Sequence, residues 1–114
     1  MITLYGIKNC DSVKKALKYF KEASIEVNFV DFKQTKPTQA QVDSWAEKSD
    51  LKKLFNNRSR TYKDLGLSKL TLSDDDKIAW MQKEPLLVKR PVIEYNGDVI
   101  VGFDETIYEG VFKS

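Results

Sequence analysis

The feature that most constrains this chain is an amphipathic helix that lies between two short apolar segments in its first 32 residues. Lysines take one face of this helix, and apolar side chains recur at helical spacing on the other, at Val13, Ala16, Leu17, Phe20 and Ala23. Residues 2–5 and 25–32, on either side of the helix, are rich in β-branched and aromatic residues and are expected to be strands. Two strands joined through a helix pair in parallel with a right-handed crossover. The chain is therefore expected to be an α/β protein that begins with a β-α-β unit.

The segment from about residue 38 to residue 84 carries only helical patterns. Thr38 and Gln41 have the spacing of a capping box, and Ser73 and Asp76 repeat it before a later apolar run. Short helical pieces are expected between these two helices. Pro85 ends the last helix, because the residue before a proline disfavours helical geometry. We therefore predict an all-helical insert at about 38–84.

The last part of the chain carries the signal of a β-hairpin. Asn96-Gly97 separates the apolar segments 91–95 and 98–101, and this dipeptide favours a tight two-residue turn. A short helix is expected from about Asp104. The order β-α-β, helical insert, β-β-α is that of a thioredoxin-like fold with a four-stranded mixed sheet. Because the sequence shows no linker and no internal repeat, we predict a single thioredoxin-like domain over residues 1–114.

The amino-acid composition excludes several kinds of catalytic and binding site. The chain has one cysteine and no histidine, which excludes Ser-His and Cys-His nucleophilic pairs and argues against a zinc site of the usual kind. The net charge of +2, from 19 basic and 17 acidic residues, is too even to indicate nucleic-acid binding. No segment approaches the roughly 20 apolar residues that span a membrane, and the N-terminus lacks the pattern of a signal peptide. We expect a cytoplasmic protein with no metal, no bound cofactor and no membrane contact.

Cys10 is the residue that we expect to carry the chemistry. It lies where the loop after the first strand turns into the first helix, and the backbone N–H groups and the helix dipole stabilise a thiolate there. Asp11 opposes this thiolate, whereas Lys8 and Lys14 favour it. The alternative is a structural thiol, since free cysteine is among the most buried residue types. The strand-to-helix turn favours the reactive thiol.

Three arginines are candidates for binding an anion. Arg90-Pro91 precedes the first hairpin strand, and in a thioredoxin topology that proline faces the start of the first helix. We expect the Arg90-Pro91 bond to be cis and Arg90 to project toward Cys10. Arg58 and Arg60 lie in a loop of the insert, where a guanidinium can bind a carboxylate, a phosphate or another oxyanion. The alternatives are an ordinary surface arginine at 90 and a solvated basic loop at 58–60.

Several blocks of the sequence resemble the arsenate-reductase-like family, and within it the YffB branch. Residues 5–16, which read YGIKNCDSVKKA, resemble the N-terminal signature of that family. The later blocks Asn57-Arg58, Lys89-Arg90-Pro91 and Gly102-Phe103 match it in order and spacing. The resemblance covers essentially the whole chain and agrees with the thioredoxin-like fold.

The resemblance also implies a chemistry. In the glutaredoxin-linked arsenate reductases of this family, a single cysteine attacks an oxyanion held by three arginines, and glutathione and a glutaredoxin resolve the adduct. Cys10 matches that nucleophile, and Arg58 and Arg90 match two of the arginines. Phe103 stands where the third is expected, and the family's histidine upstream of the cysteine is absent, which argues against efficient arsenate reduction. Arg60 is the candidate to replace the missing charge.

For the YffB branch, the resemblance implies a monothiol, glutathione-dependent thiol/disulfide oxidoreductase related to arsenate reductases. Glutathione is then the co-substrate, and a glutaredoxin is a candidate partner. The implied catalytic residues are Cys10, Arg90 and Arg58, and the residues implied to bind substrate or glutathione are Asn9, Arg58, Arg60, Arg90 and Pro91.

A regulatory protein is the alternative that the same family offers. Proteins of the Spx branch bind RNA polymerase and sense oxidation through a C-x-x-C pair. In this chain Val13 takes the place of the second cysteine, so that switch cannot form. RNA polymerase remains a candidate partner under this alternative.

Overall fold

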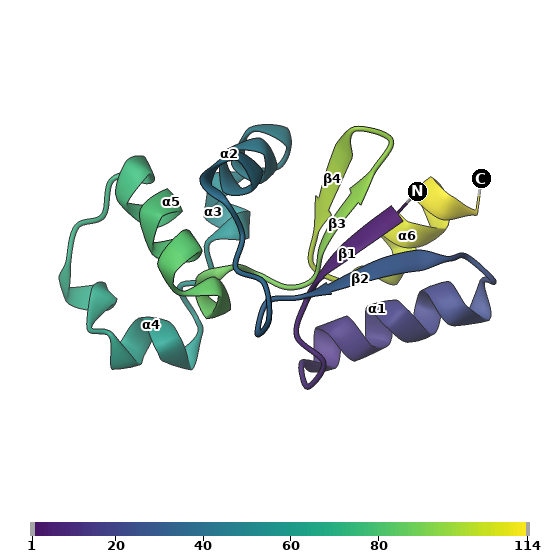
Figure 1. Cartoon of the computed structure of the whole chain (residues 1–114), viewed down its shortest axis with the longest axis horizontal. Coiled ribbons are helices and arrows are strands. Elements are labelled where there is room, and N and C mark those ends of the chain that lie inside the picture. The colour runs from purple at the N-terminus through teal and green to yellow at the C-terminus, as the bar shows by residue number, and fades with distance from the viewer. Residues whose placement is uncertain (1, 114) are drawn as a thin grey trace. The chain divides into compact units, whose positions relative to one another are not determined.

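The computed structural model describes residues 2–113, and the chain divides into two units (Figure 1). The first unit holds the residues up to Asp31 and those from Arg90 onward, and the second unit comprises Phe32–Lys89. The first therefore contains the predicted β-α-β unit and the hairpin with its terminal helix. The second contains the segment predicted to be a helical insert.

The first unit is built on a sheet with the strand order β2-β1-β3-β4 (Figure 1). Its strands are β1 (Ile2–Gly6), β2 (Val27–Asp31), β3 (Val92–Tyr95) and β4 (Asp98–Val101). β1 and β2 are parallel, whereas β3 is antiparallel to both of its neighbours, β1 and β4. This mixed four-stranded sheet and its connections confirm the predicted thioredoxin-like fold.

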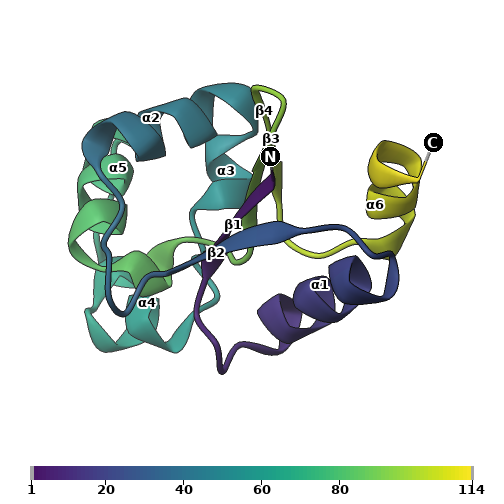
Figure 2. The ribbon, with the colours of Figure 1, turned by 45° about the vertical axis from the view of Figure 1, so that its right-hand side comes forward.

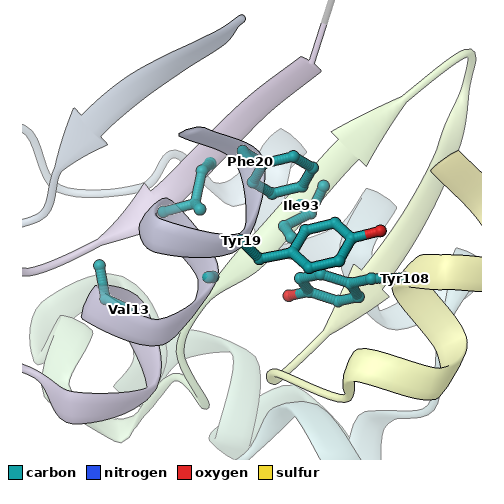
Figure 3. Packing of buried hydrophobic residues seen from close by; sticks show 7 residues of the cluster. Val13, Tyr19, Phe20, Ile93 and Tyr108 are labelled. Carbon is teal, nitrogen blue, oxygen red and sulfur yellow. The ribbon is translucent and has the colours of Figure 1, made fainter. Parts of the chain in front are cut away.

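Helices α1 (Asp11–Glu22) and α6 (Glu105–Phe112) cover the same face of the sheet (Figure 2). Leu4 of β1 and Ile93 of β3 are register partners on that face, and both are fully buried. They share a core cluster with side chains of the two helices, namely Val13, Ala16, Tyr19, Phe20 and Tyr108. Figure 3 shows the aromatic rings of this cluster, whose centroids lie 5.4–5.6 Å apart. This packing fixes α1 against the sheet and so positions its N-terminus.

The first helix ends earlier than predicted, and the second strand begins later than predicted. The helix ends at Glu22 and the strand begins at Val27, whereas the sequence pattern continues the helix to about Ser24 and starts the strand at Ile25. The N–H of Ile25 donates to the carbonyl of Phe20 at 2.9 Å, and Ser24 has a left-handed φ of 58°. This is the Schellman arrangement that ends a helix, so the intervening residues belong to neither element.

Helices make up the second unit, as the sequence predicts. They are α2 (Gln39–Lys48), α3 (Leu51–Leu54), α4 (Arg60–Asp64), α5 (Asp74–Lys83) and the 3-10 turns η1 (Leu67–Lys69) and η2 (Pro85–Leu87). Both predicted capping boxes are confirmed. At the first, the N–H of Gln41 donates to the Thr38 hydroxyl at 3.2 Å, and the N–H of Thr38 donates to the Gln41 side chain at 2.9 Å.

Candidate active site

Cys10 is the N-cap residue of α1, at the end of the loop that leaves β1. Its backbone is extended, and its carbonyl accepts the first helical hydrogen bond, from the N–H of Lys14 at 2.9 Å. Its own N–H donates to the carbonyl of Ile7 at 3.4 Å. The side chain is half-buried against the core cluster. The thiol therefore lies at the N-terminus of α1, as predicted, and is neither fully buried nor fully exposed.

Close packing between the end of β1 and the first turn of α1 holds this arrangement in place. Gly6 is buried, and a Cβ atom added to it would lie only 2.6 Å from Cγ2 of Val13. Val13 is itself fully buried, so it has no free space into which to move. Glycine is required here because the strand and the helix approach each other so closely. The first strand is predicted over residues 2–5, with Gly6 at its end, and the sequence gives no sign of this close approach.

The pKa of the Cys10 thiol is lower than its ordinary value. Partial burial raises the pKa, but the backbone N–H of Val13, the hydrogen bond and charge of Arg90, and the backbone N–H of Ser12 together lower it by more. The ionised form is the nucleophilic form of cysteine. The lowered pKa agrees with the prediction of a reactive thiol and argues against an inert structural one.

Arg90 acts on Cys10 from the segment that precedes β3. Of the cations near the thiol, it contributes most to lowering its pKa. The Arg90-Pro91 peptide bond is cis, as predicted. Pro91 is buried, and its carbonyl accepts a hydrogen bond from the N–H of Gly102 at 2.7 Å. The structure thus brings together three of the predicted site residues, Cys10, Arg90 and Pro91.

Four polar residues next to Cys10 in the sequence have exposed side chains, namely Lys8, Asn9, Asp11 and Lys14. Water and salt screen charges in such positions. The opposing effects on the thiolate that the sequence suggests for the charged members of this group are therefore weaker than the effect of Arg90. The predicted part of Asn9 in binding substrate or glutathione stays a prediction.

Arg58 and Arg60 belong to the second unit. Arg58 is exposed, and its backbone N–H donates to Oδ1 of Asn56 at 3.2 Å. Arg60 is the first residue of α4 rather than a loop residue as predicted, because the Ser59 hydroxyl caps that helix. Its side chain is 93% exposed and lies 3.7 Å from the carboxylate of Asp64. Exposed ion pairs of this kind contribute little to stability. The catalytic and binding roles predicted for these two arginines stay predictions.

Phe103 is part of the aromatic packing of the first unit. It is half-buried, and its ring lies 5.1 Å from that of Tyr108 in an edge-to-face contact. It also lines a surface pocket of about 300 Å³, together with charged residues of α1 and α6 and with Lys113.

The described part of the chain has neither a cluster of metal ligands nor a membrane-spanning helix. Within residues 2–113, no three His, Cys, Asp or Glu side chains gather as metal ligands do. None of the helices in that range has the length and apolar character needed to cross a bilayer.

Known proteins resemble this chain over almost its whole length. The model of the ArsC family matches residues 5–111. A Haemophilus influenzae protein, named only as an uncharacterized protein, is 37% identical over 119 residues, which cover 98% of this chain and 99% of that protein. The solved structure of a protein named YFFB has a TM-score of 0.91 and 30% identity, over 96% of this chain and 97% of its own.

Two more distant relatives carry names that state a function. An arsenate reductase of Yersinia enterocolitica is 24% identical over 94 residues, which cover 81% of this chain and 67% of the reductase. The regulatory protein MgsR of Bacillus subtilis is 22% identical over 105 residues, which cover 90% of this chain and 83% of MgsR. The match to the family model includes Cys10, Arg90 and Pro91, as well as the whole of strands β2, β3 and β4. The resemblance inferred from the sequence is therefore confirmed, and the chain belongs to the ArsC family.

Proposed function

We propose that this protein is a monothiol, glutathione-dependent thiol/disulfide oxidoreductase related to the arsenate reductases. The observation that carries the proposal is the half-buried Cys10 at the N-terminus of α1, with a pKa lowered by backbone N–H groups and by Arg90. Thiolates are the attacking species in thiol–disulfide exchange. Membership of a family with arsenate reductases among its members supports a redox reaction at this thiol.

The proposed reaction has two exchange steps. The Cys10 thiolate first attacks the glutathione sulfur of a mixed disulfide between glutathione and a substrate thiol. A bond forms between Cys10 Sγ and that sulfur, the substrate's S–S bond breaks, and the substrate thiolate leaves and takes a proton from water. The thiolate of a second glutathione then attacks the glutathione sulfur bound to Cys10. Glutathione disulfide leaves, and the Cys10 thiolate is regenerated.

Arg90 would act in both steps through its effect on the sulfur of Cys10. In the first step it keeps the thiol ionised, and in the second it makes Cys10 a better leaving group, because thiols of lower pKa leave faster. The resemblance assigns Arg58 to the anionic end of the substrate or of glutathione. An Arg58→Ala variant tests that role, with an increased KM for glutathione and an unchanged Cys10 pKa as the expected result.

We also propose that arsenate is a poor substrate. Phe103 stands where the family has its third arginine, and its ring packs on Tyr108. A charge-assisted hydrogen bond contributes about 1.5–3 kcal/mol. The loss of one such donor should lower the rate by about ten- to a hundredfold.

Mass spectrometry after incubation with oxidised glutathione tests the thiol chemistry. We expect one glutathionyl group on Cys10 and none on the Cys10→Ser variant. Turnover of a glutathione mixed disulfide should be measurable and should be lost in that variant. Absence of both adduct and turnover would contradict the proposal. A parallel assay with arsenate, glutathione and glutaredoxin tests the second proposal, and robust arsenate turnover there would make Arg60→Ala the next variant to measure.

A regulatory function is the second candidate, and the relationship to MgsR favours it. It corresponds to an RNA-polymerase-binding protein of the Spx type that lacks the C-x-x-C switch, because the second position is the fully buried Val13. Binding to purified RNA polymerase that is unchanged in Cys10→Ser, together with no thiol turnover, would favour this candidate over the oxidoreductase.

A further inference from the structure

The second unit contains a pocket that the proposed thiol chemistry does not use. Its volume is about 400 Å³, which is within the range of small-molecule sites. It lies among α3, α4, the segment after η1 and the first turns of α5. Four of its lining side chains are apolar or aromatic and two are cationic, namely Phe55, Tyr62, Leu70, Leu72, Lys52 and Lys77.

The apolar part of this pocket has an aromatic wall and an exposed leucine. The Phe55 and Tyr62 rings meet edge to face, with centroids 5.9 Å apart. Phe55 is buried, whereas Leu70 is 56% exposed, and Leu72 is half-buried. A ligand with an aromatic or branched apolar group could therefore remove exposed leucine surface from water while it packs against the Phe55 and Tyr62 rings.

The charged side chains that line the pocket are all positive. The residues that line it include Lys52 and Lys77 but no aspartate or glutamate. Within residues 2–113, neither lysine is paired with a carboxylate at salt-bridge distance. The Nζ atom of Lys77 lies 6.0 Å from the centroid of the Phe55 ring, which places an ammonium group beside the aromatic wall. Asp76, its neighbour in the sequence, accepts a hydrogen bond from the backbone N–H of Ser73 at 3.0 Å.

The pocket beside Phe103 in the first unit differs in this respect. Lysines and glutamates both line it, and the Lys113 ammonium lies 3.1 Å from the carboxylate of Glu109. Its charges are compensated within the protein, whereas those of Lys52 and Lys77 are not compensated by a carboxylate of the lining.

We propose that the pocket of the second unit binds a small organic anion that carries an aromatic or branched apolar group, such as an aromatic carboxylate. The apolar group packs against Phe55, Tyr62 and Leu70, and the carboxylate interacts with Lys52 and Lys77. The volume of the pocket is that of a small-molecule site. This binding is independent of the reaction at Cys10.

An NMR titration of the full chain with 2-naphthoate tests the proposal, with 2-naphthamide as the neutral ligand of the same shape. We expect saturable shifts of backbone amides that are confined to the residues lining the pocket. The neutral amide loses the charge interaction with both lysines and should bind about 25-fold more weakly, since one partly solvated ion pair contributes about fivefold. Lys77→Gln removes one of the two interactions and should weaken naphthoate binding about fivefold. Leu70→Asp, a change at an exposed position, should weaken it at least as much.

Two controls separate this site from other surfaces of the protein. Lys63→Gln removes an exposed lysine of α4 that does not line the pocket, and should leave the affinity unchanged. Cys10→Ser should also bind normally, so failure of the proposed thiol chemistry would leave this result intact. Equal affinity for naphthoate and naphthamide, shifts centred elsewhere, or a dissociation constant weaker than about 10 mM would overturn the proposal.

Discussion

Replacement of Arg90 by methionine should make the Cys10 thiol less acidic. Arg90 is half-buried and lowers the pKa of Cys10 through both a hydrogen bond and its charge. Methionine keeps an unbranched, adaptable side chain beside the buried Pro91 but has neither the donor nor the charge. The backbone N–H groups of Val13 and Ser12 stay in place, so the variant isolates the contribution of the guanidinium.

The size of the effect follows from the exposure of the thiol. A hydrogen bond to a charged group contributes about 1.5–3 kcal/mol, and the lower end applies because Cys10 is only partly buried. Since about 1.4 kcal/mol corresponds to a factor of ten, the ionisation constant of the thiol should fall about tenfold. The more basic thiolate is intrinsically more nucleophilic, with a Brønsted coefficient of about 0.4–0.5. Well below the pKa, the rate of alkylation should therefore fall only about threefold.

The assay is the rate of iodoacetamide alkylation as a function of pH, for the wild-type chain and for Arg90→Met. Lys18→Met is the matched control, because it removes the same charge from a side chain that is 78% exposed. Lys18 lies eight residues after Cys10 on α1, which is about 12 Å along the helix axis and beyond the screening length of about 10 Å. The reasoning would be refuted if the titration midpoint of Arg90→Met equals that of the wild type, or if Lys18→Met shifts the midpoint by the same amount as Arg90→Met.

Gly6→Ala should destabilise the fold by about 1–3 kcal/mol, because its methyl group overlaps the buried Val13, and should also change Cys10 alkylation as the first turn of α1 shifts. Urea unfolding and alkylation kinetics measure the two effects, and wild-type values in both would contradict the close approach described above. Tyr108→Phe should cost about 1–3 kcal/mol in thermal unfolding, because the Gly102 carbonyl loses the buried hydroxyl that donates to it at 2.7 Å. A Tm equal to that of the wild type would argue against this bond. Because folding lowers the pKa of Cys10, the unfolded chain binds more protons between the folded value and the unfolded value of about 8.5. The free energy of unfolding of the wild type, relative to that of Cys10→Ser, should therefore increase with pH through that window. The stabilisation by the thiolate should be complete above the window and should be lost as the pH falls through the folded pKa. Urea unfolding under reducing conditions measures this, and a difference that does not vary with pH would contradict the lowered pKa.

Much of the fold could be predicted because its elements carry local patterns. The hairpin illustrates this, since Asn96 and Gly97 adopt the positive φ values of 48° and 82° that the tight turn requires. The end of α1 could not be predicted as well. Ser24 adopts a left-handed conformation that glycine usually supplies, so the sequence there lacks the customary helix-stop residue.

The candidate site could be predicted only where topology decides which residues meet. Cys10 and Arg90 each flank an element of the thioredoxin-like sheet, so the element order alone brings them together. The approach of Gly6 to Val13 depends on a few tenths of an ångström of packing, which no sequence pattern encodes. An exposed arginine such as Arg60 shows its charge in the sequence but not the partner of that charge.

Gly102 links the segment that holds Pro91 to the C-terminal helix through both of its backbone polar groups. Its N–H donates to the Pro91 carbonyl, and its carbonyl accepts from the Tyr108 hydroxyl, each at 2.7 Å. The amide proton of Gly102 can therefore exchange with solvent only when the bond to Pro91 opens. Any substitution in α6 that speeds this exchange should also change the alkylation rate of Cys10, although Tyr108 is far from Cys10 in the sequence. Across a series of α6 variants, amide exchange at Gly102 and thiol reactivity at Cys10 are expected to vary together.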